Sequence, residues 1–164
     1  MFTFGMCRLW PISISLLLLP LSGCGRDSGT RVLRAIDGDT LQISEHGRTE
    51  IVRIIGIDSP ETVDPRKPVQ CYGPEASKEM HALADGKEIT LETRPGDDRD
   101  KYGRLLRYIR LGGRDLGAEM IEEGYARSYR PFPHPRMGLY NELEAQAKTA
   151  KRGVWNACAR KNKE

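Results

Sequence analysis

The sequence predicts one α+β domain in which β-structure dominates: a small barrel of five short strands with three helices. Three observations lead to this prediction. The chain has 164 residues, the length of one ordinary domain with a real core. Short runs rich in Val, Ile and Leu recur along it, separated by turn residues. Three other segments carry helix start or stop signals.

The first three strands are predicted at residues 30–36, 40–44 and 49–57, where apolar and β-branched residues gather. Residues 45–48 (Glu-His-Gly-Arg) connect the second and third as a hairpin turn. Residues 60–73 hold three prolines and several charges, which is typical of an exposed loop.

The first helix is predicted to begin at Pro74, because proline suits the first helical position, and to end near Leu83. Two strands, two helices and a proline-rich loop follow. Five strands in one meander, with a helix inserted after the third, fit an OB-like barrel, which often binds nucleic acid. The strands are expected at residues 87–93 and 104–111, the helices at 115–123 and 138–152, and the loop at 130–136.

The N-terminal 23 residues predict an export signal. Arg8 is their one charged residue, and the apolar run from Leu9 to Leu21 is shorter than the about 20 residues that cross a bilayer. Leu21-Ser22-Gly23-Cys24 resembles the bacterial lipobox, which implies that Cys24 is lipidated and becomes the mature N-terminus. An ordinary cleaved signal, giving a secreted protein, and a short N-terminal anchor are the alternatives.

Lipidation of Cys24 would hold the domain close to a membrane. Residues 24–29 form a short polar tether, and about five residues at ~3.5 Å each keep the domain within about 20 Å of the bilayer. Gly25 stands after the lipid cysteine where an aspartate is absent. This favours the outer membrane, on its periplasmic side, if the host is Gram-negative.

Two cysteines remain for the folded domain, Cys71 and Cys158. An exported compartment permits disulfides, so we expect these two to be bonded, the alternative being two buried thiols. A zinc site is disfavoured, because neither has a CxxC neighbour and the chain has three histidines. Without its first 23 residues the chain has 25 basic and 23 acidic side chains. That net charge of +2 is too small for a protein that coats DNA non-specifically.

Three short motifs put charged residues at the ends of apolar, strand-like runs. They are Asp37-Gly38-Asp39-Thr40, residues 53–61 (Arg-Ile-Ile-Gly-Ile-Asp-Ser-Pro-Glu) and Asp100-Lys101-Tyr102-Gly103-Arg104. Carboxylate oxygens without a nearby His or Cys select a hard cation, calcium or magnesium. Guanidinium groups bind phosphate oxygens through paired N–H donors. Together the motifs suit a site that holds a phosphodiester while an activated water attacks it.

Each motif alone has a simpler interpretation. Asp37 and Asp39 could cap a turn, and a single arginine could form a surface salt bridge. Arg53 and Asp58 are five residues apart, so one unbroken strand would send them to opposite faces. Either Gly56 marks a bulge, or Asp58 already lies in the following loop. The three histidines stand outside the motifs, which disfavours a histidine–metal nuclease.

With these motifs, the chain resembles the staphylococcal-type thermonuclease family, calcium-dependent nucleases built on an OB-fold barrel. The matching stretches run from about Val32 to Trp155. They also include Tyr72-Gly73-Pro74-Glu75-Ala76-Ser77 and residues 142–148 with Gly153-Val154-Trp155. The nuclease-like domain is accordingly expected at residues 30–158, with a frayed tail at 159–164.

The resemblance implies a role for each motif residue. Asp39 and Asp58 would ligate calcium directly, with the backbone carbonyl of Ser59 as a third ligand. The family usually has threonine at that position, and a backbone contact survives the change. Glu61 would be the general base, and Arg53 and Arg104 would bind phosphate and stabilise its developing charge.

Three further residues are expected to contact the substrate. Tyr102 resembles a tyrosine that supports the phosphate, and Lys101 would lie near the incoming strand. Tyr129 is carried over as a base-stacking or phosphate-contacting residue, although the spacing around it departs from the family pattern and ordinary packing is the alternative.

The function expected from the sequence is a calcium-dependent endonuclease that hydrolyses DNA and RNA and leaves 3′-phosphate ends, acting as a monomer. The alternative is an OB-fold module that binds nucleic acid or protein without cutting. A third reading is an adaptor whose acidic cluster only binds calcium. All five residues expected to be catalytic or metal-binding through their side chains are present, which favours the enzyme: Asp39, Arg53, Asp58, Glu61 and Arg104.

Overall fold

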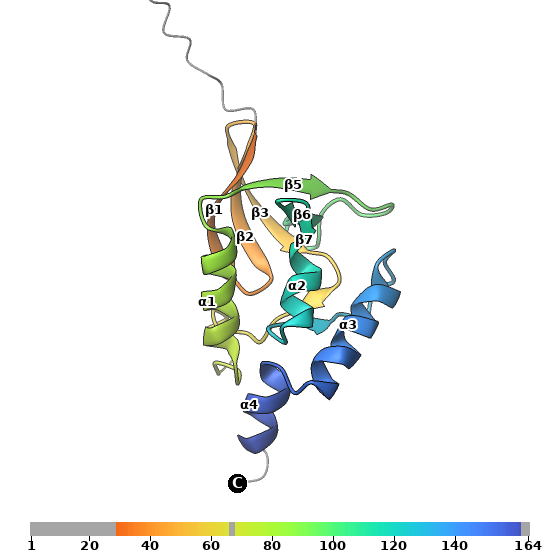
Figure 1. Ribbon diagram of the computed structural model, residues 1–164. Helices are drawn as coiled ribbons and strands as arrows, with labels where there is room; N and C mark the ends of the chain where they lie inside the picture. The colour runs from red at the N-terminus through yellow and green to blue at the C-terminus, as the bar shows by residue number, and fades with distance from the viewer. Residues whose placement is uncertain (1–28, 66–67, 162–164) are drawn as a thin grey trace, which may run out of the picture.

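The computed structural model describes residues 29–65 and 68–161. The expected export signal, the lipidation at Cys24 and most of the tether lie outside these residues. Within them, five strands form a closed barrel, as Figure 1 shows. The strands are β1 (Thr30–Asp37), β2 (Thr40–Glu45), β3 (Arg48–Ile54), β5 (Glu88–Glu92) and β6 (Leu105–Leu111).

Strand order explains how the barrel closes. Hydrogen-bonded neighbours follow the order β3-β2-β1-β5-β6, all antiparallel, and a parallel pairing of β3 with β6 joins the two ends. In that pairing Val52 lies opposite Leu105 and Arg53 opposite Leu106. Closure therefore brings the end of β3 beside the start of β6, although about fifty residues separate them in the sequence.

Three two-residue strands complete the β-structure. β4 (Ile57–Asp58) pairs with β8 (Arg127–Ser128), and β7 (Arg114–Asp115) extends the sheet beyond β6. The sequence predicted one strand over residues 49–57, and this extent is wrong, because β3 ends at Ile54. Gly56 has φ +80°, a left-handed conformation that breaks the strand before β4 begins.

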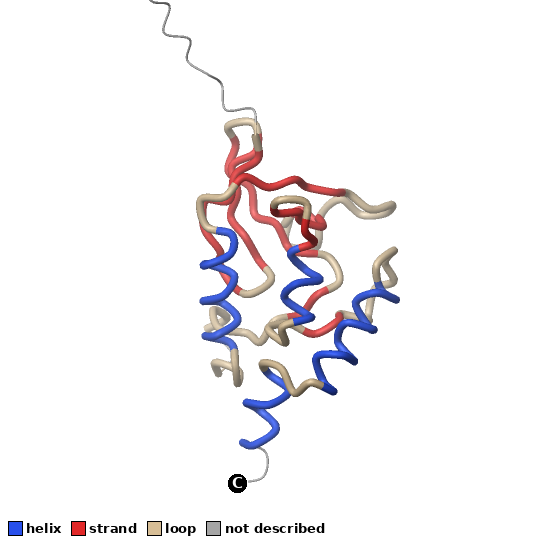
Figure 2. Tube along the Cα trace, in the orientation of Figure 1, coloured by secondary structure: helices blue, strands red, loops and turns tan. Residues whose placement is uncertain are grey.

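Helices cover the barrel along one side and at one end (Figures 1 and 2). α1 (Gly73–Ala84) packs against β1, and α2 (Leu116–Glu122) lies between β6 and α3 (Met137–Thr149). These are the three predicted helices. α4 (Val154–Lys161) was not predicted. Gly153 indicated only the end of α3, and the eight residues after it are too few to show a helical period.

The core fills the barrel and the space beneath the helices. Buried apolar side chains come from the strands, such as Leu41 and Ile43 of β2, and from the inner faces of α1 and α2. No helix in the described segments is long and apolar enough to cross a membrane. The largest side chains that are completely buried include Leu41, Ile43, Ile54, Ile57, Met80, Ile109, Leu116, Met120, Ile121 and Tyr140.

Candidate functional site

Two adjoining hollows lie where β3, β4 and the start of β6 meet. The acidic hollow, about 560 Å³, is lined by Asp37, Asp39, Ser59 and Glu61 among others. The basic hollow, about 520 Å³, is lined by three cations and three rings: Arg94, Arg99, Lys101, Tyr129, Phe132 and His134. Four residues line both hollows: Arg53, Asp58, Tyr102 and Arg104. All the predicted catalytic, metal and substrate residues thus line these two hollows.

The turn between β1 and β2 holds the first carboxylates against the segment after β4. A Cβ built on Gly38 would lie 2.7 Å from the Cβ of Ser59, so only glycine lets the two segments approach this closely. Asp39 Oδ2 accepts a hydrogen bond of 3.0 Å from the Ser59 backbone N–H. The Asp39 side chain is therefore fixed to the backbone of a second predicted metal ligand.

Asp37 is the most deeply buried carboxyl of the acidic hollow, with 5% of its surface exposed. Its Oδ1 accepts hydrogen bonds from Gly38 N–H and from the Thr62 hydroxyl. Burial raises the pKa of Asp37 from 3.8 to about 6, and the nearby charges of Asp39 and Glu61 act in the same direction. The ionised form of Asp37 is therefore less stable here than in water, and a bound cation would stabilise it.

Arg53 connects the carboxylates across the turn at Gly56. Its Nη1 donates to the carbonyls of Ile54 and Ile57, at 2.9 and 2.8 Å. Its Nη2 lies 3.0 Å from Asp39 Oδ2 and 3.6 Å from Asp58 Oδ1. Because the chain reverses at Gly56, Arg53 and Asp58 point into one site despite their odd spacing. Neither possibility raised from the sequence is correct as stated, because Gly56 lies in a turn after β3 rather than in a bulge, and Asp58 lies in the short strand β4 rather than in a loop.

Glu61 is held in one orientation by the turn that follows it. Its Oε1 accepts hydrogen bonds of 2.9 to 3.1 Å from the backbone N–H groups of Thr62, Val63 and Asp64. Burial pushes the pKa of Glu61 upward, but the N–H donors of Val63 and Asp64 outweigh it and hold the pKa below its usual value. Glu61 is therefore an ionised, oriented carboxylate at neutral pH.

Arg104 stands immediately before β6, and Asp100 places it. Asp100 Oδ1 accepts from the backbone N–H groups of Tyr102 and Arg104, and Oδ2 accepts from Arg104 Nε at 2.7 Å. Burial of Asp100 acts to raise its pKa, yet the bonds from Arg104 outweigh this and hold the pKa low, so the Asp100 carboxylate is ionised at neutral pH. Since β6 pairs with β3, the Arg104 side chain reaches the rim that both hollows share with Arg53.

The basic hollow combines cations with exposed rings. Tyr102 is 68% exposed, and both Lys101 Nζ and the Arg104 guanidinium lie over its ring, 5.0 and 5.4 Å from the centroid. Tyr129 is placed by its N–H bond to the Gly56 carbonyl, and its ring centroid lies 6.0 Å from that of Phe132. Such pairs of rings and cations are typical of surfaces on which unstacked nucleobases bind.

Sequence reasoning missed several residues of the basic hollow. Phe132 is 66% exposed within the proline-rich loop, and an aromatic residue in a segment without regular structure was the available signal. His134 was expected to lie away from the motifs, and this is wrong. Its ring packs against Gly56 so closely that a Cβ there would lie 2.4 Å from Cε1, and its Nδ1 lies 2.9 Å from the Tyr108 hydroxyl.

The donor atoms of the acidic hollow fit a hard cation. In the described ranges no three His, Cys, Asp or Glu side chains gather as a complete metal cluster. A cation here would therefore be held by the carboxylates of Asp39 and Asp58, a backbone carbonyl such as that of Ser59, and water. Oxygen-only ligands with retained water suit calcium or magnesium rather than zinc. The Asp58 side chain is 55% exposed, so the site is open on the solvent side.

Comparison with known proteins relates this chain to a family of nucleases. Residues 51–157 match the family model described as staphylococcal nuclease homologue. Over 125 residues, 75% of the chain, it is 38% identical to endonuclease YncB and to the SPbeta prophage-derived endonuclease YokF, both of Bacillus subtilis (strain 168). The chain spans only 59% and 42% of the lengths of these two relatives.

The staphylococcal relatives are covered more completely. The chain is 36% identical to the thermonuclease of Staphylococcus hyicus over 128 residues, which are 77% of this chain and 75% of that protein. It is 38% identical to the thermonuclease of Staphylococcus intermedius over 126 residues, covering 76% and 74% of the two proteins. The chain therefore belongs to the staphylococcal nuclease family.

Proposed function

We propose that this protein is a calcium-dependent endonuclease that hydrolyses phosphodiester bonds of DNA and RNA and leaves 3′-phosphate ends. One observation carries the proposal: the carboxylates of Asp39, Asp58 and Glu61 line the acidic hollow together with the guanidinium groups of Arg53 and Arg104. The names of its relatives, endonuclease and thermonuclease, support the same class of reaction.

Asp39, Asp58 and the Ser59 carbonyl would hold the calcium ion, whose charge would stabilise the phosphate oxygens as negative charge builds on them. Glu61 is ionised and held by its three N–H donors, so its carboxylate can orient a water molecule and accept its proton. Arg53 and Arg104 can donate to the phosphate oxygens, which grow more negative as the water attacks.

The water oxygen forms a new bond to phosphorus as the bond from phosphorus to the 5′ oxygen breaks. The 5′ oxygen leaves as a hydroxyl after taking a proton from solvent, the proton accepted by Glu61 passes back to solvent, and the 3′ oxygen keeps the phosphate. Because the attacking group is water and not the 2′-hydroxyl, the chemistry needs no ribose, which supports cleavage of both DNA and RNA. Lys101, Tyr102 and Tyr129, with Phe132, would receive the neighbouring phosphate and base in the basic hollow.

The test is cleavage of quenched fluorescent single-stranded DNA and RNA by the purified full-length protein, with calcium, with magnesium and with chelator. We expect cleavage with calcium and a loss of about 10²–10³-fold in kcat for Arg104→Ala. Arg114→Ala is the matched control, because Arg114 lies on β7 outside both hollows.

Two outcomes would count against the proposal. A folded protein that binds DNA but cleaves neither substrate with any metal would support the non-catalytic binding module instead. Equal losses for Arg104→Ala and Arg114→Ala would show that the observed cleavage does not arise from this site.

A further inference from the structure

Gln70, near the end of the loop that precedes α1, is hydrogen-bonded to the backbone of Glu61 near the start of that loop. The Gln70 N–H donates to the Glu61 carbonyl at 2.9 Å, and the Gln70 side-chain Oε1 accepts from the Glu61 N–H at 3.2 Å. One residue therefore binds both backbone groups of Glu61 across nine positions of the sequence. Since Glu61 Oε1 is held by the following turn, the placement of its carboxylate depends on where this backbone is fixed.

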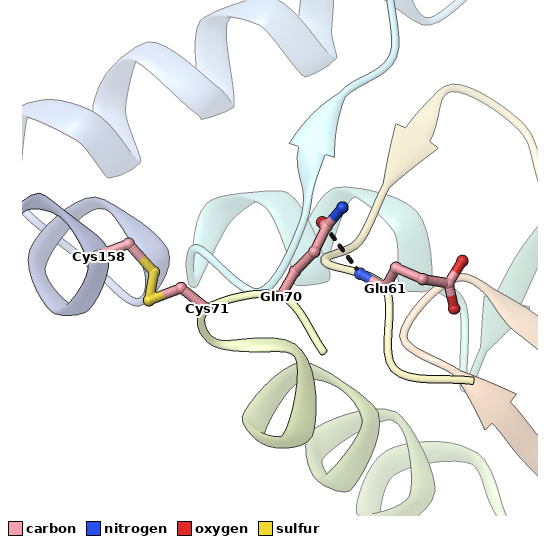
Figure 3. Close-up of a disulfide and its surroundings, with 4 residues drawn as sticks. All are labelled: Glu61, Gln70, Cys71 and Cys158. Atoms are coloured by element: carbon pink, nitrogen blue, oxygen red, sulfur yellow. Dashed lines mark hydrogen bonds between the residues drawn. A yellow bond between two sulfur atoms is a disulfide. The ribbon is translucent and has the colours of Figure 1, made fainter. Parts of the chain in front are cut away.

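The residue after Gln70 is covalently attached to another part of the molecule. Cys71 is bonded to Cys158 of α4, with 5.9 Å between the Cα atoms. Figure 3 shows the resulting path, from α4 through the disulfide to Gln70 and on to the Glu61 amide. Both cysteines are only partly buried, so a reductant can reach the bond.

The helix that carries Cys158, α4, is firmly attached to the rest of the fold. The start of α4 is fixed by the bond from Val154 N–H to the Gly124 carbonyl, and Val154 itself is buried. Gly124 and Gly153 approach so closely that a Cβ on Gly153 would lie 2.3 Å from the Gly124 carbonyl oxygen. The disulfide therefore connects the Glu61 loop to a rigid part of the fold.

A second contact would keep the loop near this position without the disulfide. The Tyr72 ring stacks on Tyr125, with centroids 5.7 Å apart and 20° between the planes. Loss of the disulfide would thus release Cys71 while Tyr72 stays attached. The expected consequence is a small displacement of Gln70 and Glu61 rather than unfolding of the loop.

We propose that Gln70 is a positioning residue for Glu61, and that the Cys71–Cys158 disulfide holds Gln70 in place, so that catalytic activity depends on the oxidised state. The predicted effect on the catalytic rate rests on the proposed function. The predicted effect on the structure, that Gln70 and the disulfide fix the Glu61 backbone, is independent of the proposed function.

The experiment compares the full-length wild type, oxidised and reduced with dithiothreitol, with Gln70→Ala and Gln70→Glu. Gln70→Glu keeps an acceptor oxygen at the same reach and serves as the conservative rescue. Gln146→Ala is the matched control, an exposed glutamine of α3 outside both hollows. Circular dichroism confirms that each sample is folded at the assay temperature.

Two quantities are measured on each sample: kcat and KM on single-stranded DNA with calcium, and hydrogen exchange of the Glu61 and Gln70 amides by NMR. We expect Gln70→Ala and the reduced protein to lose about tenfold to a hundredfold in kcat at unchanged KM, because a small misplacement of a reacting group has this effect. Glu61 N–H exchange should rise in both. Gln70→Glu should keep the slow exchange of the Glu61 amide, because the acceptor oxygen is retained, and Gln146→Ala should match the wild type in exchange, kcat and KM.

Unchanged exchange of the Glu61 amide in Gln70→Ala and on reduction would overturn the inference. Faster exchange with unchanged kcat in an active enzyme would also overturn it, because the backbone contact would then not position the carboxylate. If the wild type cleaves no substrate, the proposed function fails, while the exchange data still decide whether Gln70 and the disulfide hold Glu61.

Discussion

Arg53 binds both the backbone and the carboxylates of the site. Its guanidinium joins two backbone carbonyls on either side of the Gly56 turn to the carboxylates of Asp39 and Asp58. Its side chain is 15% exposed, so these interactions are little screened by water. Arg53 therefore holds β3 and β4 in their relative orientation, and we propose that it also presents positive charge to a phosphate.

Arg53→Lys tests whether the hydrogen bonds of the guanidinium are needed at this position or whether a positive charge is sufficient. A lysine keeps the positive charge but offers a single ammonium, which cannot reach both carbonyls and both carboxylates together. We expect kcat on single-stranded DNA to fall by about 10²-fold or more. Arg34→Lys, at an exposed arginine of β1 bonded to Gln42, should leave kcat unchanged. Equal kcat values for Arg53→Lys and wild type would mean that charge alone suffices at this position.

At the scale of elements, the apolar runs and turn residues predicted all five barrel strands and three of the helices. The motifs likewise predicted that their own charged residues would line one site, but Arg94 and Arg99, which lie outside the motifs, also line it. The local pattern could not show that a single glycine with positive φ would turn the chain and bring Asp58 beside Arg53. Nor could it show that Phe132 and His134 would reach the basic hollow, because those placements depend on how α3 and its preceding loop pack.

A buried carboxylate on α3 binds the backbone of β8, beside a second bond from the Ser128 hydroxyl to Asn141. Glu144 is 2% exposed and is bound by Arg130, by Lys148 Nζ at 2.9 Å and by the Ser128 N–H. Burial acts to raise the pKa of Glu144, but the bonds from Arg130 and Lys148 outweigh it, so the pKa lies below the usual 4.5. A group whose pKa is lowered by folding stabilises the protein above its unfolded pKa, and this contribution is lost as the pH falls.

Glu144→Gln should therefore destabilise the protein at neutral pH much more than in acid. At pH 7 we expect the free energy of unfolding to drop by about 1–3 kcal/mol, because buried donors lose a charged acceptor. The difference from wild type should shrink as the pH falls below 4.5 through the folded pKa. Urea unfolding across this range measures it, with the exposed Glu142→Gln on the same helix as control. A difference that does not change with pH would contradict the charge-based explanation.

At the scale of the whole molecule, the disulfide joins the loop before α1 to the last helix. It closes 87 residues, which in the chain-entropy model stabilises the fold by about 4–5 kcal/mol. A bond of this kind persists in oxidising compartments. The disulfide therefore supports the export that the N-terminal sequence predicts, and we propose that the protein is attached to the cell envelope by a lipid on Cys24.

Substitution of Cys24 tests this proposal in cells. Cys24→Ser should move the protein from the membrane fraction to the soluble fraction and abolish incorporation of labelled fatty acid, because a serine cannot carry the thioether-linked lipid. Cys7→Ser, within the expected signal, is the control and should leave both unchanged. Persistent membrane association of Cys24→Ser without lipid label would favour the uncleaved N-terminal anchor, and secretion of the wild type would favour the ordinary signal.

The parallel pairing of β3 with β6 determines how much of the chain must be synthesised before the barrel can close. Arg53, Asp39 and Asp58 all leave the ribosome early, but their partner Arg104 comes about fifty residues later, next to the strand that completes the ring. A nascent chain that stops before Arg104 has neither the second guanidinium nor the strand that closes the barrel. Arg53 and Arg104 therefore lie side by side only after the barrel has closed, so an incomplete chain lacks the complete site that we propose for phosphodiester hydrolysis.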